Sequence, residues 1–167
     1  MSLYKTWYHP YNVNAAYSKR VAYFCMEYGI HQALKTYSGG LGFLAGSHMR
    51  SAFTLRQNLI GIGILWKYGY YDQQRNDDLT MRVHFQKKFY SFLEDTGIMV
   101  EVRVNNHPVL VKALVLKPEI FGTAPIYFLT TDIHENDYLA RTITHKLYDA
   151  ETAARIAHCI VLGLGGA

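Results

Sequence analysis

A glycine-rich turn, Ser38-Gly39-Gly40-Leu41-Gly42, is the stretch of this sequence best suited to hold a ligand. It separates a short apolar run at residues 21–26 from residues 43–55, where apolar side chains recur at spacings of three and four. The first pattern predicts a strand and the second a helix. A helix that begins at such a turn leaves its first backbone N–H groups without partners, so an anion or a sugar oxygen can bind them. An ordinary tight turn would produce the same pattern.

Two physical reasons are expected for glycine in this turn. A Cβ atom would keep a ligand away from the backbone, and the turn could require a positive φ. The helix dipole would add about half a unit of positive charge at the same place. The residues alone therefore predict a ligand site at Gly39, Gly40, Leu41 and Gly42, open to an anion or a sugar oxygen.

The elements around the turn predict an α/β fold. A strand at residues 21–26, a helix from Gly42 to about Leu55 and a buried strand at residues 59–65 form a βαβ unit. The helical spacing places Leu44, His48, Ala52 and Leu55 along one side of the helix, with His48 expected to be buried.

The remaining sequence predicts additions to this unit. Apolar and polar residues alternate on both sides of a turn within residues 99–116, which predicts an antiparallel hairpin attached to a parallel sheet. Residues 126–131 predict another buried strand, and a final helix is expected to begin near Asp149 as its N-cap. Residues 74–80 are polar and are expected to form an exposed tip. Residues 1–20 are expected to be a lead-in segment that packs on a neighbour.

Composition narrows the class of protein. The chain has 167 residues, enough for one domain with a real core, and a formal net charge of +4 without a block of Lys or Arg, which argues against nucleic-acid binding. Cys25 and Cys159 lie in apolar runs without metal-type spacing and are expected to be buried thiols. No apolar stretch is long enough to span a membrane and the N-terminus lacks a signal-peptide pattern, so we expect a cytoplasmic protein without membrane contact.

Several motifs together are similar to the α-glucan (glycogen/maltodextrin) phosphorylase family, in its short bacterial form. They cover roughly residues 15–167 and read YFCMEYGIH (23–31), YSGGLGFLAGSH (37–48), GIGIL (61–65), YGYYDQ (68–73), TD with EN (131–136), THKLYD (144–149) and IVLGLGG (160–166). Ser47 and His158-Cys159 depart from the residues that many members carry, and no role is assigned to these three positions.

The resemblance implies a fold and an activity for the parent protein. It implies a GT-B glycosyltransferase with two Rossmann-like domains, which cleaves the terminal α-1,4 linkage of a glucan with inorganic phosphate and releases glucose 1-phosphate. It also implies pyridoxal 5′-phosphate, bound to a lysine of the second domain. Residues 21–167 would then be part of the first domain, and we expect a longer parent protein, because a Gly-x-Gly-Gly run such as Gly163–Gly166 normally introduces another element.

The resemblance also implies roles for particular residues. Gly39, Gly40 and Leu41 match the turn that approaches the phosphate and the glucose unit. Glu27 matches a glutamate at the cleft, where a carboxylate could accept a sugar hydroxyl or order water. The residues alone equally allow Glu27 to cap the nearby helix or to pair with Arg50. His31 and Tyr70 are second-tier candidates, and a packing role is expected to be the commoner one for His31.

Two other functions stay open at this point. A glycogen or starch synthase shares the GT-B arrangement, but such enzymes carry a lysine two residues before the glycine pair, where this chain has Tyr37. A non-catalytic α/β module that binds glucan is the second alternative. The cofactor lysine of the resemblance lies beyond residue 167, so we expect this chain to be inactive alone. Hydrophobic surface left exposed could drive the formation of a homodimer.

Overall fold

The structure, a computed structural model, describes residues 9–167. Its elements in chain order are the 3-10 turn η1 (Ala15–Tyr17), β1 (Val21–Phe24), α1 (Gly40–Thr54), β2 (Leu59–Ile64), β3 (Asp72–Arg75), β4 (Met81–His84), β5 (Glu94–Val104), β6 (His107–Leu116), α2 (Pro118–Phe121), β7 (Ile126–Thr130), α3 (Tyr138–Thr142) and α4 (Thr152–Gly163). The predicted strands, the predicted hairpin and the two long helices are all present, with ends that differ by a few residues.

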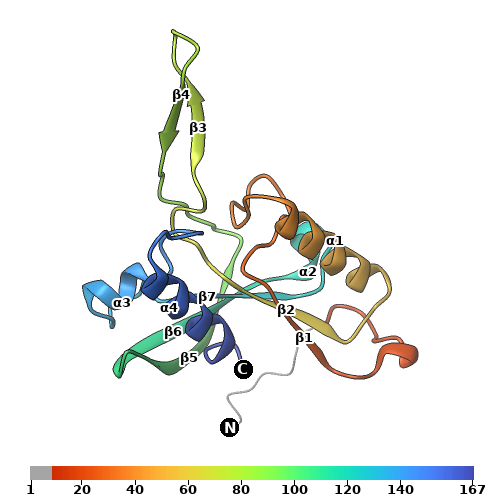
Figure 1. Cartoon of the computed structure of the whole chain (residues 1–167). Helices are drawn as coiled ribbons and strands as arrows, with labels where there is room; N and C mark the ends of the chain where they lie inside the picture. The colour runs from red at the N-terminus through yellow and green to blue at the C-terminus, as the bar shows by residue number, and fades with distance from the viewer. Residues whose placement is uncertain (1–8) are drawn as a thin grey trace.

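The fold is a mixed five-stranded sheet with strand order β1-β2-β7-β6-β5 (Figure 1). β1, β2 and β7 run parallel, while β6 is antiparallel to β7 and β5 is antiparallel to β6. The parallel βαβ unit and the attached antiparallel hairpin are therefore confirmed. The three parallel strands end side by side at residues 24, 64 and 130, and this carboxyl edge is where open α/β sheets place their ligands.

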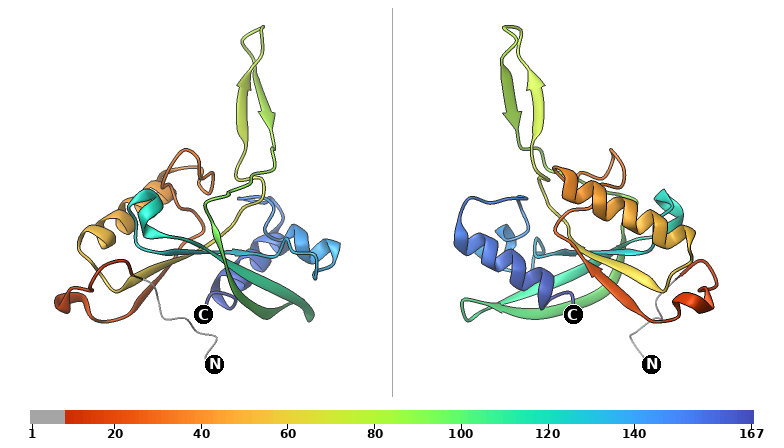
Figure 2. Two further views of the ribbon diagram at one scale, coloured as in Figure 1. Left: turned by 180° about the vertical axis from the view of Figure 1, so that it is seen from behind. Right: turned by 45° about the vertical axis from the view of Figure 1, so that its right-hand side comes forward.

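Two helices cover opposite faces of the sheet (Figure 2). Met49 of α1 shares one core cluster with Phe128 of β7, whereas Val161 of α4 shares the other with Ile62 of β2. Every residue of β2 is buried, as the apolar run predicts for a strand covered on both faces. The sheet thus has one core on each side.

Glycines in β2 make room for a buried ring on the α1 face. A Cβ at Gly63 would lie 2.7 Å from a ring carbon of Tyr28, and one at Gly61 would lie 3.0 Å from its hydroxyl oxygen. The Tyr28 ring is fully buried and meets Phe128 edge-on at 6.0 Å. Because Tyr28 directly follows Glu27, this packing fixes the chain where it leaves β1.

The predicted face of α1 is wrong. The buried residues are Gly42, Ala45, Gly46, Met49 and Ala52, whereas Leu44 is 65% exposed and Leu55 is 45% exposed. His48 is exposed as well, with its ring 4.8 Å from that of Tyr23. The reason is a close approach: a Cβ at Gly46 would overlap the backbone of Gly29, so the helix turns its smallest residues inward.

The start of α4 and the burial of the two cysteines differ in part from expectation. The N-cap of α4 is Glu151 and not Asp149, and the side chain of Glu151 makes no capping hydrogen bond. Asp149 lies two residues earlier and accepts the N–H of Glu151 at 3.0 Å. Cys25 is buried as expected, but Cys159 is exposed. The buried residues of α4 are Ala157, His158, Val161 and Leu162, whereas Ile156 is 56% exposed.

Within the chain between β2 and β5, the strands β3 and β4 form an arm that stands away from the sheet (Figure 1). β3 and β4 pair antiparallel around a turn at residues 76–80, which confirms the exposed tip. Its two strands were not predicted, since Asp72–Arg75 carries no apolar alternation.

Residues 9–20 contact the connection between α1 and β2. The hydroxyl of Tyr11 donates to the carbonyl of Gln57 at 2.9 Å, and the N–H of Asn58 donates to the carbonyl of Tyr17 at 3.3 Å. Residues 1–8 of the expected lead-in segment lie outside the described residues. Among the described residues, no helix has the length and apolar character needed to cross a membrane.

His158 should make stability depend on pH. Burial lowers its pKa, against smaller opposing effects of a backbone hydrogen bond to Ile143 and the charge of Asp149. An unfolded histidine has a pKa near ~6.5. Between this value and the lower pKa of the folded chain, the unfolded chain binds a proton at His158 that the folded chain does not bind. The free energy of unfolding should therefore fall as the pH is lowered from 7.5 through ~6.5 toward the folded pKa.

Urea unfolding at pH 7.5 and at pH 5.5 measures this effect. His158→Gln should reduce the difference between the two pH values, whereas His134→Gln, at an exposed histidine, should leave it unchanged. An unaltered pH dependence in His158→Gln would contradict the assignment.

Candidate functional site

The glycine turn lies at the carboxyl edge of the parallel strands, at the start of α1. Gly39 is the N-cap, with an extended backbone and no side-chain cap, and α1 begins at Gly40. The N–H groups of Gly42 and Phe43 donate to the carbonyl of Gly39 at 3.1 and 3.4 Å. The N–H groups of Gly40 and Leu41 precede these and have no acceptor within the helix. These two groups are the donors that an anion could use.

The glycines of the turn differ in why they must be glycine. A Cβ at Gly42 would meet the Cβ of Tyr37 at 2.5 Å, so the fold itself requires Gly42. A Cβ at Gly39 or Gly40 would meet no atom of the described chain within 4 Å, and neither residue has a positive φ. The expectation of a positive φ is therefore wrong. Internal packing does not account for Gly39 and Gly40, and both leave space beside the free donors.

The buried side chain of Glu27 accepts hydrogen bonds from the first residues of the glycine turn. This side chain is 1% exposed, and Oε2 accepts the N–H of Ser38 at 2.7 Å and that of Gly39 at 3.2 Å. The carboxylate thus accepts two N–H groups that precede the first residue of α1, a contact related to the helix cap that was one of the alternatives left open by the sequence. It does not pair with Arg50, which donates instead to the carbonyls of Ile30 and Phe121 at 2.6 and 2.9 Å.

A segment near the C-terminus reaches the same carboxylate. The hydroxyl of Tyr148 donates to Oε1 of Glu27. Tyr148 has a φ of 60°, and the N–H of Leu147 before it donates to the carbonyl of Gly69 at 3.1 Å. Residue types gave no signal for this contact, because 121 positions separate its two partners.

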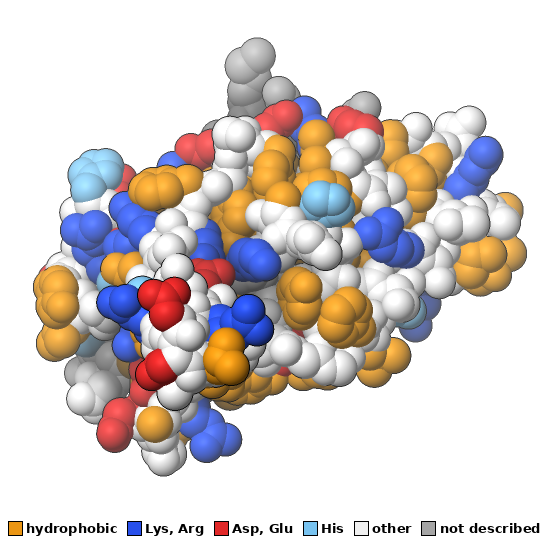
Figure 3. All heavy atoms as spheres, turned by 90° about the horizontal axis from the view of Figure 1, so that it is seen from above, with side chains coloured by type: hydrophobic (Ala, Val, Ile, Leu, Met, Phe, Trp, Pro, Cys, Tyr) orange, Lys and Arg blue, Asp and Glu red, His pale blue; other side chains and the backbone are white. Residues whose placement is uncertain are grey.

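A pocket of about 220 Å³ opens beside the turn. Its lining is mostly aromatic and polar and comprises Lys35, Tyr37, Ser38, Tyr68, Tyr70, Tyr71, Asp72, Gln73 and Lys88. Lys88 and Asp72, both in the lining, form an ion pair. The ring centroids of Tyr70 and Tyr71 lie 4.2 Å apart. Aromatic faces with hydroxyl groups and charged side chains suit a polyol ring. On the face of the molecule from which the arm projects, basic, acidic and hydrophobic side chains are intermingled (Figure 3).

The candidate residues do not all meet at this place. Gly39, Gly40, Leu41 and Gly42 form the turn, and Glu27 and Tyr70 lie next to it. His31 does not line the pocket: its ring stacks on Phe121 at 4.6 Å, and its Nδ1 accepts the N–H of Ala33 at 3.1 Å. Its contacts are those of a packing residue.

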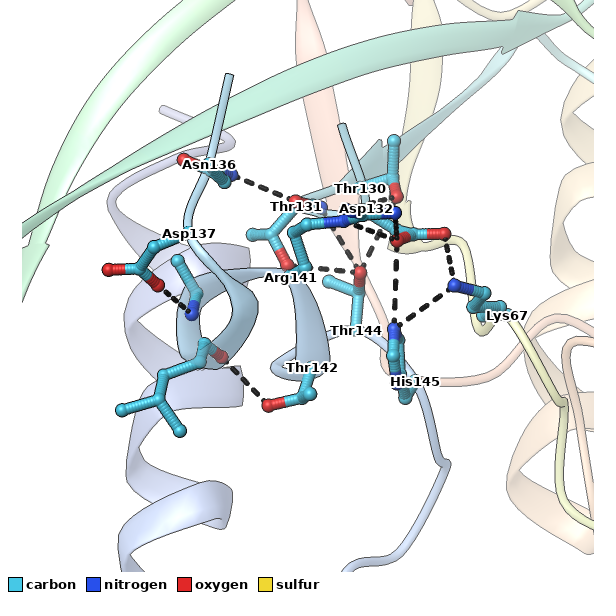
Figure 4. Close-up of polar contacts among 12 residues, drawn as sticks. Lys67, Thr130, Thr131, Asp132, Asn136, Asp137, Arg141, Thr142, Thr144 and His145 are labelled. Carbon is cyan, nitrogen blue, oxygen red and sulfur yellow. Dashed lines mark hydrogen bonds and ion pairs between the residues drawn. The ribbon is translucent and has the colours of Figure 1, made fainter. Parts of the chain in front are cut away.

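A second polar cluster follows β2 and β7 at the same edge (Figure 4). Asp132 binds Lys67 at 2.7 Å and Arg141 at 3.1 Å, and His145 lies 3.7 Å from the same carboxylate. Burial alone would raise the pKa of Asp132, but the hydrogen bond and charge of Lys67, with help from Arg141, hold it below its usual value. Thr144 supports the cluster by accepting the N–H of Thr131 at 3.1 Å.

Sequence reasoning missed this cluster as a unit, although its signal was present. Lys67 and Asp132 each come just after a predicted parallel strand, and the carboxyl ends of parallel strands meet at one edge. The cluster holds the segment that carries His145 against the end of β2, where the N–H of Tyr68 donates to the carbonyl of His145 at 2.9 Å.

The described residues do not fit a covalent pyridoxal phosphate site. A lysine that forms a Schiff base needs a neutral, desolvated amine. Lys67 is paired with Asp132 and Lys88 with Asp72, so neither of these two amines is presented unpaired to a ligand. No arrangement of side chains within residues 9–167 marks a place for the cofactor.

Comparison with known proteins defines the class of this chain: it is homologous to the glycogen and maltodextrin phosphorylases over most of its length. The chain is 37% identical over 154 residues to the maltodextrin phosphorylase of Thermococcus litoralis, which covers 87% of this chain and 18% of that protein. It is 35% identical over 157 residues to the glycogen phosphorylase of Mycobacterium tuberculosis, with the same coverage. The resemblance seen in the motifs is thus confirmed, and it implies a GT-B-type fold.

A more similar relative carries no assigned activity. The chain is 60% identical over 148 residues to an uncharacterized protein of Methanocaldococcus jannaschii, which covers 89% of this chain and 28% of that protein. No protein-family model matches the chain. The chain therefore spans between about a fifth and just over a quarter of the length of these relatives.

The two kinds of glycine in α1 predict opposite effects of alanine. Gly46→Ala should destabilise the chain by roughly 1–3 kcal/mol, because the new Cβ would lie 2.2 Å from the carbonyl oxygen of Gly29 and backbone would have to shift. Gly40→Ala should change stability by no more than about 0.5 kcal/mol, because its Cβ meets open space. Urea unfolding of the two variants measures the difference, and equal losses would contradict the packing described here.

Proposed function

We propose that this chain is the N-terminal part of an α-1,4-glucan phosphorylase, a glycosyltransferase that releases glucose 1-phosphate from glycogen or maltodextrin with inorganic phosphate. The observation that carries the proposal is the open space beside Gly39 and Gly40, where a Cβ would meet no atom of the described chain within 4 Å. Packing does not require glycine at these positions, and the adjacent N–H groups of Gly40 and Leu41 have no acceptor within the helix. A ligand that approaches the backbone closely gives a reason for both facts.

The chemistry of phosphorolysis suits this arrangement. Its transition state places an oxocarbenium-like sugar next to a phosphate, so the site must stabilise an anion and hold a sugar ring in place. The start of α1 offers two N–H donors and the positive end of the helix dipole. The tyrosine-lined pocket beside it offers a surface for the glucan. In this proposal the chain supplies one wall of the site.

The comparisons support a phosphorylase over the two alternatives. The named relatives at 35–37% identity are phosphorylases. Tyr37 stands where a synthase would carry its lysine. The cofactor would be bound by a second domain of the parent protein, together with its lysine, so this chain alone should not turn over glucan.

Binding of inorganic phosphate to the 167-residue chain tests the proposed site. In an NMR titration, phosphate should shift the amide signals of Gly40 and Leu41 more than those of the sheet, and sulfate at matched ionic strength should show how far any anion does so. Gly40→Val should remove these shifts while the remaining spectrum keeps its dispersion. Equal shifts over the whole surface would contradict the proposal.

Activity of the full gene product tests the proposed reaction. Gly40→Val should remove most phosphorolysis of maltoheptaose, measured as release of glucose 1-phosphate, because the side chain fills the space beside the donors. Leu139→Val, at an exposed position on α3, is the matched control and should keep normal turnover. Near-normal turnover in Gly40→Val would reject the role of the turn.

A further inference from the structure

The Glu27 carboxylate has all its contacts on two distant segments. Oε2 accepts two N–H groups of the glycine turn, those of Ser38 and Gly39, and Oε1 accepts the hydroxyl of Tyr148. At 1% exposure the carboxylate has almost no access to water. Among the described residues its orientation is therefore set by these three donors, of which Tyr148 alone donates from a side chain.

Tyr148 adopts a backbone conformation that a bulky residue avoids. Its φ is 60°, which costs on the order of 1–3 kcal/mol and persists only where the surroundings impose it. The surroundings here are backbone hydrogen bonds just before it: Leu147 donates to Gly69, and Lys67 and Tyr68 donate to Thr144 and His145. The segment 144–147 is thus fastened to the end of β2, and this directs the next residue toward Glu27.

Burial does not explain the placement of the Tyr148 ring. The side chain is 55% exposed, and its ring contact is an edge-on one with Tyr70 at 6.1 Å between centroids. Its hydroxyl, by contrast, is engaged: the hydrogen bond to the Glu27 carboxylate, with a smaller contribution from burial, raises the pKa of Tyr148 to about 12. The contact that the strained backbone achieves is this hydrogen bond.

We propose that Tyr148 is a positioning residue for the glycine turn. By donating to Oε1 it fixes the Glu27 carboxylate, whose other oxygen holds the Ser38 and Gly39 N–H groups and so orients the first turn of α1. Glu27 occupies the two N–H groups behind the turn, which leaves those of Gly40 and Leu41 as donors for a ligand. This last step rests on the proposed function, whereas the coupling of Tyr148 to the turn does not.

Hydrogen exchange on the ligand-free chain tests the coupling. Tyr148→Phe keeps the ring and removes the donor, so exchange of the Ser38 and Gly39 amides should rise roughly tenfold, while amides of the sheet keep their protection. Tyr138→Phe loses a hydroxyl at a position that is 78% exposed and should change neither amide. Unchanged exchange of both amides in Tyr148→Phe would overturn the proposal.

A spectroscopic readout separates positioning from general structural support. In chain with ¹³C-labelled tyrosine, the Cζ signal of Tyr148 should titrate near pH 12 in the parent sequence and near ~10 in Glu27→Gln. The double variant Glu27→Gln with Tyr148→Phe should exchange no faster at Ser38 and Gly39 than the faster single variant, because both remove one contact. A titration of Tyr148 near pH ~10 in the parent sequence, or additive effects, would overturn the proposal. The titration of Tyr148 uses only the parent sequence and Glu27→Gln, so it stands even where Tyr148→Phe loosens the whole fold.

Phosphate binding then separates this inference from the proposed function. Tyr148→Phe should raise the Kd for phosphate, obtained from the shifts of the Gly40 and Leu41 amides, roughly threefold to tenfold relative to the parent chain. Phosphate that has no effect on the parent chain would reject the proposed function, and the ligand-free exchange and titration would still decide the role of Tyr148. An unchanged Kd for phosphate in Tyr148→Phe would reject the positioning role.

Discussion

The structure depends on one buried carboxylate at the carboxyl edge of its sheet. A carboxyl group buried away from water is costly unless hydrogen bonds replace the lost hydration. Glu27 obtains them from the glycine turn on one side and from Tyr148 on the other. The end of β1, the start of α1 and the segment before α4 must therefore meet at one point, and that point adjoins the candidate ligand site.

Close approach of backbone to backbone is the second constraint. The chain after Glu27 runs against α1 so tightly that the N–H of Gly29 donates to the carbonyl of Gly42 at 2.8 Å. Only small residues fit on that face of the helix, so Gly42 and Gly46 are explained by packing. Gly39 and Gly40 are not, and this contrast within one motif distinguishes a glycine that builds the fold from one that leaves room for a ligand.

The charged cluster around Asp132 completes the edge without binding the turn. Lys67, Arg141 and His145 surround a single carboxylate, and the backbone beside them fastens residues 144–147 to the end of β2. The edge therefore has two layers: an ion-pair cluster that fixes the segment, and a hydrogen bond by which that segment reaches Glu27. The chain is homologous to the glycogen and maltodextrin phosphorylases, and in the proposed function this edge would hold an anion beside a sugar.

Local pattern was enough to determine the elements and the place of the turn. Runs such as residues 59–65 and the alternation in residues 99–116 reflect burial on two faces or on one, so strands, hairpin and family motifs could be predicted. The buried face of α1, the exposure of Cys159 and His48, and the partners of Glu27 could not. Each of these features depends on which distant segment of the chain packs against the residue. Periodicity records how apolar a face is, whereas contact between residues 27 and 148 exists only once the sheet has brought them together.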